Sequence, residues 1–133
     1  MPRKRTKKRK NEQITDEETL PSTPKEDEET ETLKAKLESI KNSPEVIGYI
    51  IRNSRSATID AKDPTKIIDY AILSSSTIEM AEKLTEAFQL GTAEKIILEG
   101  ENAKLLSLSI NNNSISIFTE KNADTNKIYK KLI

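Results

Sequence analysis

The chain has 133 residues, enough for one domain of modest size, and its 34% apolar and 33% charged residues make it more polar than an average domain. It contains neither cysteine nor histidine, which excludes disulfides, thiolate metal sites, thiol nucleophiles and histidine-based acid–base chemistry. Basic and acidic residues number 22 each, so the net charge is zero.

The charges are segregated at the start of the chain. Seven of the first ten residues are basic, namely Arg3, Lys4, Arg5, Lys7, Lys8, Arg9 and Lys10, and residues 11–32 are mostly acidic. Residues 1–31 contain one isoleucine, one leucine and no aromatic residue. Such a segment cannot bury enough apolar surface to offset the entropy of ordering it. We therefore expect residues 1–31 to form a disordered arm and residues 32–133 to form the folded domain.

Neither a targeting segment nor a membrane span is predicted. No apolar run of secretory type follows the basic start, and no later stretch approaches the ~20 apolar residues of a membrane-spanning helix. We expect a cytoplasmic protein.

The first two-thirds of the domain predict a helix, two strands and a long helix. In "LKAKLESIK", Leu33, Leu37 and Ile40 share one helical stripe, and "NSP" at 42–44 ends that helix. The stretch "EVIGYIIRNSRSATID" predicts two strands around a polar turn at 52–56. Asp63 is the expected N-cap of a helix over about 64–90, which Gly91 would end.

The long helix carries two partly apolar stripes. One consists of Leu73, Thr77, Met80, Leu84 and Ala87, and the other of Ile67, Ala71, Ser74, Ile78, Ala81 and Phe88. Together they are wider than the stripe needed to cover one sheet face. Either the helix is deeply buried, or one stripe covers the sheet and the other meets a partner.

The last third predicts three strands, in "AEKIILEG", "AKLLSLSI" and "SISIFT", and a final helix from about Asn122. The last two strands alternate isoleucine or leucine with serine. A loop of two or four residues between them sets like residues opposite each other, whereas a loop of three does not. Asn111 and Asn112 tolerate left-handed conformations and suit a tight primed turn. The element order indicates an α+β layered domain with two antiparallel groups of strands.

The strand in "EKIILEG" has apolar residues on both faces. Ile96, Ile97 and Leu98 are consecutive. This pattern is typical of a central strand, or of an edge strand completed by another chain.

The candidate catalytic and ligand-binding residues favour a protein that is not an enzyme and uses no cofactor or metal. The three glycines lie in no phosphate-binding motif. The run "SSST" at 74–77 has no activating base, so we interpret it as small residues that permit close packing. Asp60, Asp63 and Asp69 are weak candidates for Mg²⁺, and Arg52 and Arg55, beside a turn, are interpreted as solvated.

Residues 33–133 resemble a Roadblock domain, the family of the dynein light chain Roadblock and of prokaryotic regulators of Ras-like GTPases. The resemblance is carried by "SPEVIGYII" with its Val-x-Gly pattern, by "TIEMAEKLTEAFQLG", and by "EKIILEGENAKLLSLSINNNSISIF". Many members turn the first hairpin with Asp-Gly, where this chain has "RNSRS".

The resemblance implies a fold and a function. It implies an α-β-β-α-β-β-β-α domain whose five-stranded antiparallel sheet has the strand order two, one, five, four, three, with the long helix on one face and the terminal helices on the other. It also implies homodimerisation through the long helix and the third strand, and non-catalytic binding of a small Ras-like GTPase. The expected interface residues are Leu73, Thr77, Met80, Leu84, Ile96, Ile97 and Leu98.

Two functional hypotheses follow. In the first, the chain is a dimeric scaffold or regulator that binds a small GTPase. In the second, it is an accessory nucleic-acid-binding protein in which the basic arm binds and the domain only dimerises. The seven cations suit phosphates or an anionic membrane surface equally, and they also suit the acidic segment that follows them.

Overall fold

The computed structural model describes residues 14–17 and 24–133, which form six strands and three helices. In chain order these are β1 (Ile14–Glu17), α1 (Pro24–Lys41), β2 (Val46–Arg52), β3 (Ser56–Ala61), the short 3₁₀ helix η2 (Pro64–Lys66), α2 (Ile67–Ala87), β4 (Lys95–Glu99), β5 (Ala103–Ile110), β6 (Asn113–Glu120) and α3 (Thr125–Leu132). The strands form one antiparallel sheet in the order β1-β3-β2-β6-β5-β4. The five predicted strands have the expected order, and β1 adds a sixth at the β3 edge.

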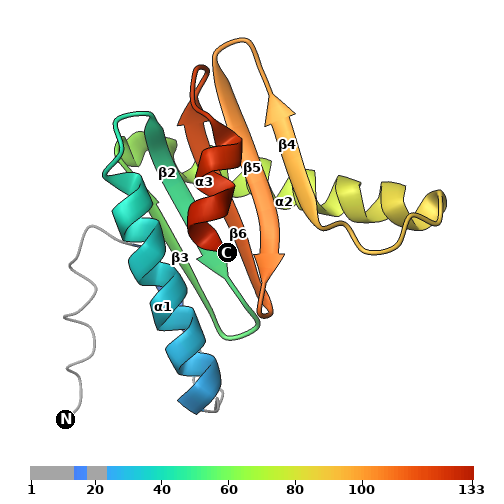
Figure 1. Ribbon diagram of the computed structural model, residues 1–133, viewed down its shortest axis with the longest axis horizontal. Coiled ribbons are helices and arrows are strands. Elements are labelled where there is room, and N and C mark those ends of the chain that lie inside the picture. Colours follow the sequence, from blue (N-terminus) through green and yellow to red (C-terminus); the bar gives the residue numbers. More distant parts are fainter. Residues whose placement is uncertain (1–13, 18–23) are drawn as a thin grey trace.

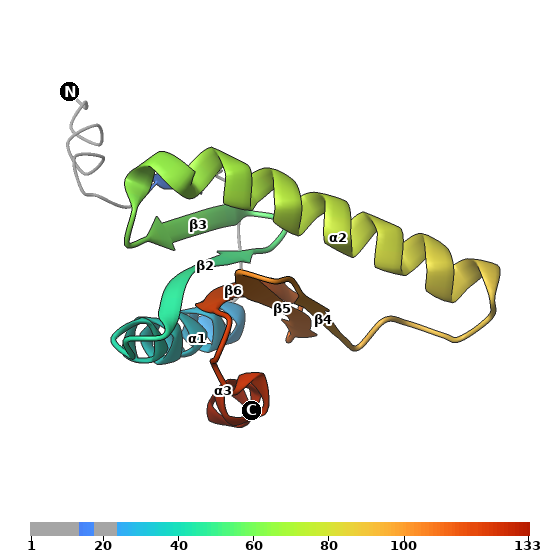
Figure 2. The same ribbon diagram turned by 90° about the horizontal axis from the view of Figure 1, so that it is seen from above.

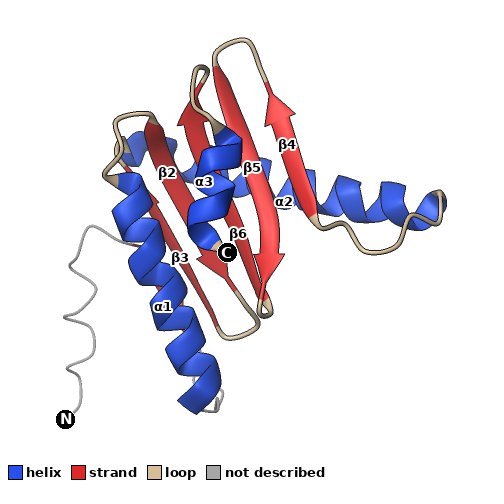
Figure 3. Ribbon diagram, in the orientation of Figure 1, coloured by secondary structure: helices blue, strands red, loops and turns tan. Residues whose placement is uncertain are grey.

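Helices cover the sheet on both faces. Helices α1 and α3 lie on one face and α2 lies on the other (Figures 1 and 2). Coloured by secondary structure, the model shows the two hairpins β2–β3 and β5–β6 at the centre of the sheet and β4 at its edge (Figure 3). This arrangement confirms the predicted α+β layered fold.

The β5–β6 hairpin has the two-residue loop that the sequence predicts. Ile110 pairs with Asn113, and the two residues between them, Asn111 and Asn112, have φ values of 50° and 66°. Both values are positive, as a primed turn requires. The register sets Leu108 opposite Ile115 and Ser107 opposite Ser116, so like residues lie opposite each other as expected.

The β2–β3 hairpin depends on a glycine and an asparagine. A Cβ atom on Gly48 would lie 2.7 Å from the backbone oxygen of Asp60, so the close approach of the strands explains the glycine of the Val-x-Gly pattern. In the turn, the Asn53 side chain accepts hydrogen bonds from the backbone N–H groups of Arg55 and Ser56, at 2.8 and 3.0 Å. An Asn side chain thus closes the turn in place of Asp-Gly.

The larger apolar core lies between the sheet and helices α1 and α3. Leu33, Leu37 and Ile40 of α1 pack with apolar residues of β2, β5 and β6 and with Ile128 and Leu132 of α3. A smaller cluster, Ile50, Leu105 and Phe118, faces α2 and is joined by Ile47, Ile59 and Tyr70. The predicted stripe of α1 is therefore confirmed as core.

Helices α1 and α2 begin at other residues than the sequence predicts. Helix α1 begins at Pro24, before the expected start near Thr32, because proline is tolerated in the first turn of a helix and acidic residues favour its N-terminus. Strand β1 also lies within the segment assigned to the arm. Asp63 caps the 3₁₀ turn Pro64–Lys66, accepting a hydrogen bond from the Thr65 N–H at 3.1 Å, and not the long helix itself, since α2 begins only at Ile67.

The C-terminal end of α2 comes earlier than expected. The helix ends at Ala87, and Gln89 and Gly91 take positive φ values of 56° and 90°. The left-handed residues reverse the chain toward β4. The final helix begins at Thr125. The side chain of Asp124 caps it by accepting hydrogen bonds from the backbone N–H groups of Asn126 and Lys127.

Candidate self-association and partner surface

Helix α2 is the least buried long element of the domain. Among its 21 residues only Ile67 and Ser74 are buried. Of the stripe that contains them, Ala71, Ile78 and Ala81 are half-buried, and Phe88 is exposed. The interpretation of α2 as a deeply buried helix is therefore wrong for the single chain.

The other stripe of α2 is largely exposed. Met80 and Leu84 are 62% and 54% exposed, Leu73 is also exposed, and Thr77 is half-buried. Large apolar side chains at this exposure, four residues apart on a helix, form a continuous apolar ridge. We call Leu73, Thr77, Met80 and Leu84 the α2 ridge.

Strand β4 is an edge strand, so its interpretation as a central strand of the chain's own sheet is wrong. It pairs only with β5 in the described sheet. Ile97 lies opposite Leu106 of the larger core, whereas Leu98 lies opposite Leu105 of the cluster facing α2. Ile97 and Leu98 are 42% and 46% exposed. The strand therefore presents apolar side chains on both faces and an open backbone edge.

The C-terminal half of α2 and strand β4 lie at the same end of the molecule. The C-terminal half of α2 extends past β4, beyond the sheet (Figures 1 and 2). A groove of about 70 Å³ separates them; it is lined by residues of α2, the α2–β4 connection and β4–β6, including Ile78, Glu82, Ala93, Ile96 and Ser107. The structure thus places the two elements that carry the predicted interface residues at the same edge of the sheet.

Four exposed apolar residues in or just after α2 were not predicted as interface residues. Phe88 and Leu90 are 70% and 71% exposed at the projecting end of α2, and Ile68 and Ile72 are exposed near its start. Phe88 lies on the stripe of the buried Ile67 and Ser74, but it is exposed because the C-terminal end of α2 extends beyond the sheet. Ile68 and Ile72 lie four residues apart and outside both stripes, and this spacing could have indicated a further apolar surface on the helix.

Three serine hydroxyls join α2 to the sheet. Ser116 Oγ lies 2.6 Å from Ser74 Oγ and 2.8 Å from Ser107 Oγ, and all three residues are buried. The interpretation of "SSST" as small residues that permit close packing is confirmed for Ser74. Ser75 instead accepts a hydrogen bond from Arg52 at 3.0 Å.

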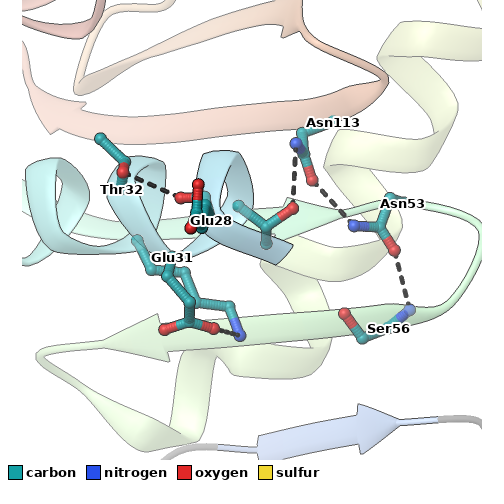
Figure 4. Close-up of polar contacts among 8 residues, drawn as sticks. Glu28, Glu31, Thr32, Asn53, Ser56 and Asn113 are labelled. Atoms are coloured by element: carbon teal, nitrogen blue, oxygen red, sulfur yellow. Dashed lines mark hydrogen bonds and ion pairs between the residues drawn. The ribbon is translucent and has the colours of Figure 1, made fainter. Parts of the chain in front are cut away.

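A polar network joins the two turns at one end of the sheet to α1. Asn53 Nδ2 donates to Asn113 Oδ1 at 2.9 Å, and Asn113 Nδ2 donates to Asn111 O at 3.2 Å and to Thr30 Oγ1 at 3.4 Å (Figure 4). Asn113 is buried. Because its donors and acceptor have partners inside the protein, this network is structural rather than an open ligand site.

The acidic and basic residues singled out in the sequence do not form a chemical site. Asp60 binds Lys41 Nζ at 2.8 Å, and Asp63 is a helix cap whose hydrogen bonds from Thr65 lower the pKa of its carboxyl group. In residues 14–17 and 24–133, no group of three or more possible metal ligands is arranged to hold an ion. The seven basic residues of the arm lie outside the described residues. No helix of the described part is long and apolar enough to cross a membrane.

Comparison with known proteins identifies the architecture. No protein-family model and no curated protein matches the sequence. Among solved structures, the chain is similar to the Roadblock/LC7 domain from Streptomyces avermitilis, with a TM-score of 0.59 and 12% identity, over 74% of this chain and 83% of that chain. The chain has a Roadblock-like fold. At this identity the likeness shows the fold alone, so the function of this Roadblock-like domain must be argued from its surfaces.

Proposed function

We propose that this Roadblock-like protein is a dimeric, non-catalytic scaffold or regulator that binds a small Ras-like GTPase. The observation that carries the proposal is the pairing of the exposed α2 ridge with the open, apolar β4 edge on one side of the molecule. A second copy related by a two-fold axis covers both at once, because β4 pairs with β4 and the projecting helices pack together. We assign the predicted interface residues, Leu73, Thr77, Met80, Leu84, Ile96, Ile97 and Leu98, to this surface as part of the proposal.

The GTPase part of the proposal rests on the Roadblock resemblance. Roadblock domains commonly serve as platforms for a small Ras-like GTPase or hold a larger complex together, and the same role is proposed here. The chain's mixed, balanced charges from Leu33 onward suit a protein partner better than a polyanion. A cytoplasmic location is part of the same proposal.

Sedimentation velocity over a range of concentrations tests the dimer. Leu84→Glu and Ile97→Lys each place a charge in the proposed interface and are expected to convert the dimer to a monomer. Ile133→Lys is the matched control, since Ile133 is 65% exposed on the side of α3. A full chain that stays monomeric at every concentration, or a dimer that Leu84→Glu and Ile97→Lys leave unchanged, contradicts the proposed interface.

Affinity recovery from lysate, with GTP analogue or GDP added and with identification of the captured proteins, tests the partner. Nucleotide-dependent recovery of a small GTPase supports the proposal. The full chain and a variant lacking residues 1–13 are compared, since the shorter chain lacks all seven arm cations. GTPase recovery is expected to be equal for both. Recovery of nucleic acid by the full chain alone, with no GTPase, supports the second hypothesis, in which the basic arm binds nucleic acid.

A further inference from the structure

The two edges of the sheet differ. At one edge, β4 pairs with no described strand other than β5. At the other, residues 14–17 pair antiparallel with β3, setting Ile14 opposite Ile59, Thr15 opposite Thr58, and Glu17 opposite Ser56. The chain thus covers the β3 edge with its own short strand.

Without β1, the β3 edge has none of the usual protection against strand pairing. Ser56–Ala61 contains neither proline nor glycine, and its ladder with β2 runs without a register shift. Its one charged residue, Asp60, is buried and paired with Lys41. Proline, bulges and outward charges are what natural edge strands use to prevent pairing, so an uncovered β3 is a template for another strand.

The described strand β1 is shorter than β3. Its four residues pair with Ser56–Ile59, and among the described residues none pairs with Asp60 or Ala61 on that side. A four-residue strand held by one ladder is a short, weakly stabilised element, because isolated strand pairs are marginally stable in water. A six-residue strand in its place would pair with all of β3.

The sequence of β3 is complementary to itself in antiparallel register. A two-fold axis through Ile59, perpendicular to the sheet, keeps side chains on matching faces and sets Ile59 opposite Ile59, Thr58 opposite Asp60, and Ala57 opposite Ala61. The two Asp60 carboxylates do not lie directly opposite each other. In this register, Ile59 of the second copy takes the position opposite Ile59 that Ile14 holds in the intact chain.

We propose that the β3 edge is a second self-association edge, which residues 14–17 occupy in the intact chain and which the β3 strand of a second copy takes when those residues are displaced. This inference does not depend on the proposed β4 dimer. With both edges open, however, each copy would offer two separate two-fold contacts, and assembly would extend without closing. Strand β1 therefore limits association to the β4 side.

The first test displaces β1 in the full chain by the double substitution Thr15→Pro and Asp16→Pro. Consecutive N–H groups of a strand point to opposite sides, so one of the two prolines removes a donor to β3 whichever way β1 faces. The matched control is Thr6→Pro, in the basic segment. The readout is the mass in solution, measured in the Leu84→Glu, Ile97→Lys background so that the β4 contact is absent.

In that background the double-proline variant is expected to double in mass, while the Thr6→Pro control keeps the mass of the parent. An unchanged mass overturns the proposal. If the full chain proves monomeric, the β4 dimer fails while the gain on displacing β1 still tests the β3 edge, so the two failures are distinguishable.

A second test uses the displaced strand itself and requires that the variant be folded, as circular dichroism would show. A variant lacking residues 1–17 is compared with one lacking residues 1–13, which keeps β1. A peptide with residues 11–20, NEQITDEETL, is then added. It is expected to reverse the self-association of the shorter chain, whereas a scrambled peptide has no effect. Association that the peptide leaves intact contradicts pairing at β3.

Discussion

The two faces of the sheet differ in what holds them to their helices. On the face of α1 and α3, leucine and isoleucine from five elements form one continuous apolar core. On the face of α2, the β5–β6 hairpin presents serines at 107 and 116, and the apolar contact is limited to a small cluster that includes stacked rings of Tyr70 and Phe118, 4.3 Å apart.

The alternation of the hairpin strands explains this difference. Because Leu106, Leu108, Ile115 and Ile117 all face α1 and α3, the intervening serines must face α2. Serine permits a close helix approach through Ser74, but buries little apolar surface. The comparison indicates that one face supplies most of the stability of the fold, while the other leaves α2 with apolar surface for association.

The largest expected effect is the loss of a leucine on the stable face. Leu37→Ala empties a site whose residue is 0% exposed, so the free energy of unfolding should fall by about 2–5 kcal/mol. Leu84→Ala, on α2, should change it by less than about 0.5 kcal/mol when measured at low protein concentration, where association contributes little. Chemical denaturation measures both. Equal losses would break the contrast between the faces.

The serine contact is the second place to test the comparison. Ser116→Ala removes the hydroxyl shared by Ser74 and Ser107 and leaves both without this partner, so it should destabilise the domain by about 1–3 kcal/mol. Ser109→Ala, at an exposed serine of β5 in the same hairpin, is the control and should be neutral. A neutral Ser116→Ala would show that the hydroxyls contribute nothing to holding α2.

Local patterns in the sequence predict those features that depend on neighbouring residues. Like residues match across the β5–β6 hairpin only with certain loop lengths, and Asn111 and Asn112 favour the two-residue solution found in the structure. The stripe of Leu33, Leu37 and Ile40 likewise predicts its own burial. Both predictions depend on contacts within one or two elements.

Features set by long-range placement are not visible in such patterns. Nothing local reveals that α2 extends beyond the sheet by Phe88, because that depends on where the helix crosses the strands. The polar composition of residues 14–17 gives no strand signal, and β1 is defined by its backbone pairing with β3. The interface residues of α2 and β4 could be proposed in advance only because the Roadblock resemblance placed both elements together.

Titration of a buried tyrosine should distinguish the faces by pH. Burial, and then the hydrogen bond that Tyr49 donates to Glu38 at 2.5 Å, raise the pKa of Tyr49 above its ordinary value. The unfolded chain ionises tyrosine near pH ~10 while the folded chain keeps the proton, so stability should be lost as the pH rises above that value. Burial also raises the pKa of Tyr70, on the α2 face, but less strongly.

Denaturation at pH 8 and above pH 10 measures this effect. Tyr49→Phe should lower stability at pH 8 by about 1 kcal/mol, through loss of the hydrogen bond, and should reduce the further loss at high pH. Tyr70→Phe should reduce that loss less. A larger effect of Tyr70→Phe would place the more deeply buried tyrosine on the α2 face and contradict the comparison.

The smallest expected effect concerns the β5–β6 turn, which sets the alternation on both faces. Asn112 has a φ of 66°, a conformation that glycine adopts without the steric cost of a Cβ atom, so Asn112→Gly should stabilise the domain by about 0.5 kcal/mol. Because the register stays the same, serines still face α2, and self-association should not change. Asn112→Ala, the matched control, should destabilise the domain. A change in association with Asn112→Gly would show that the turn, and not the distribution of apolar residues between the faces, controls the α2 surface.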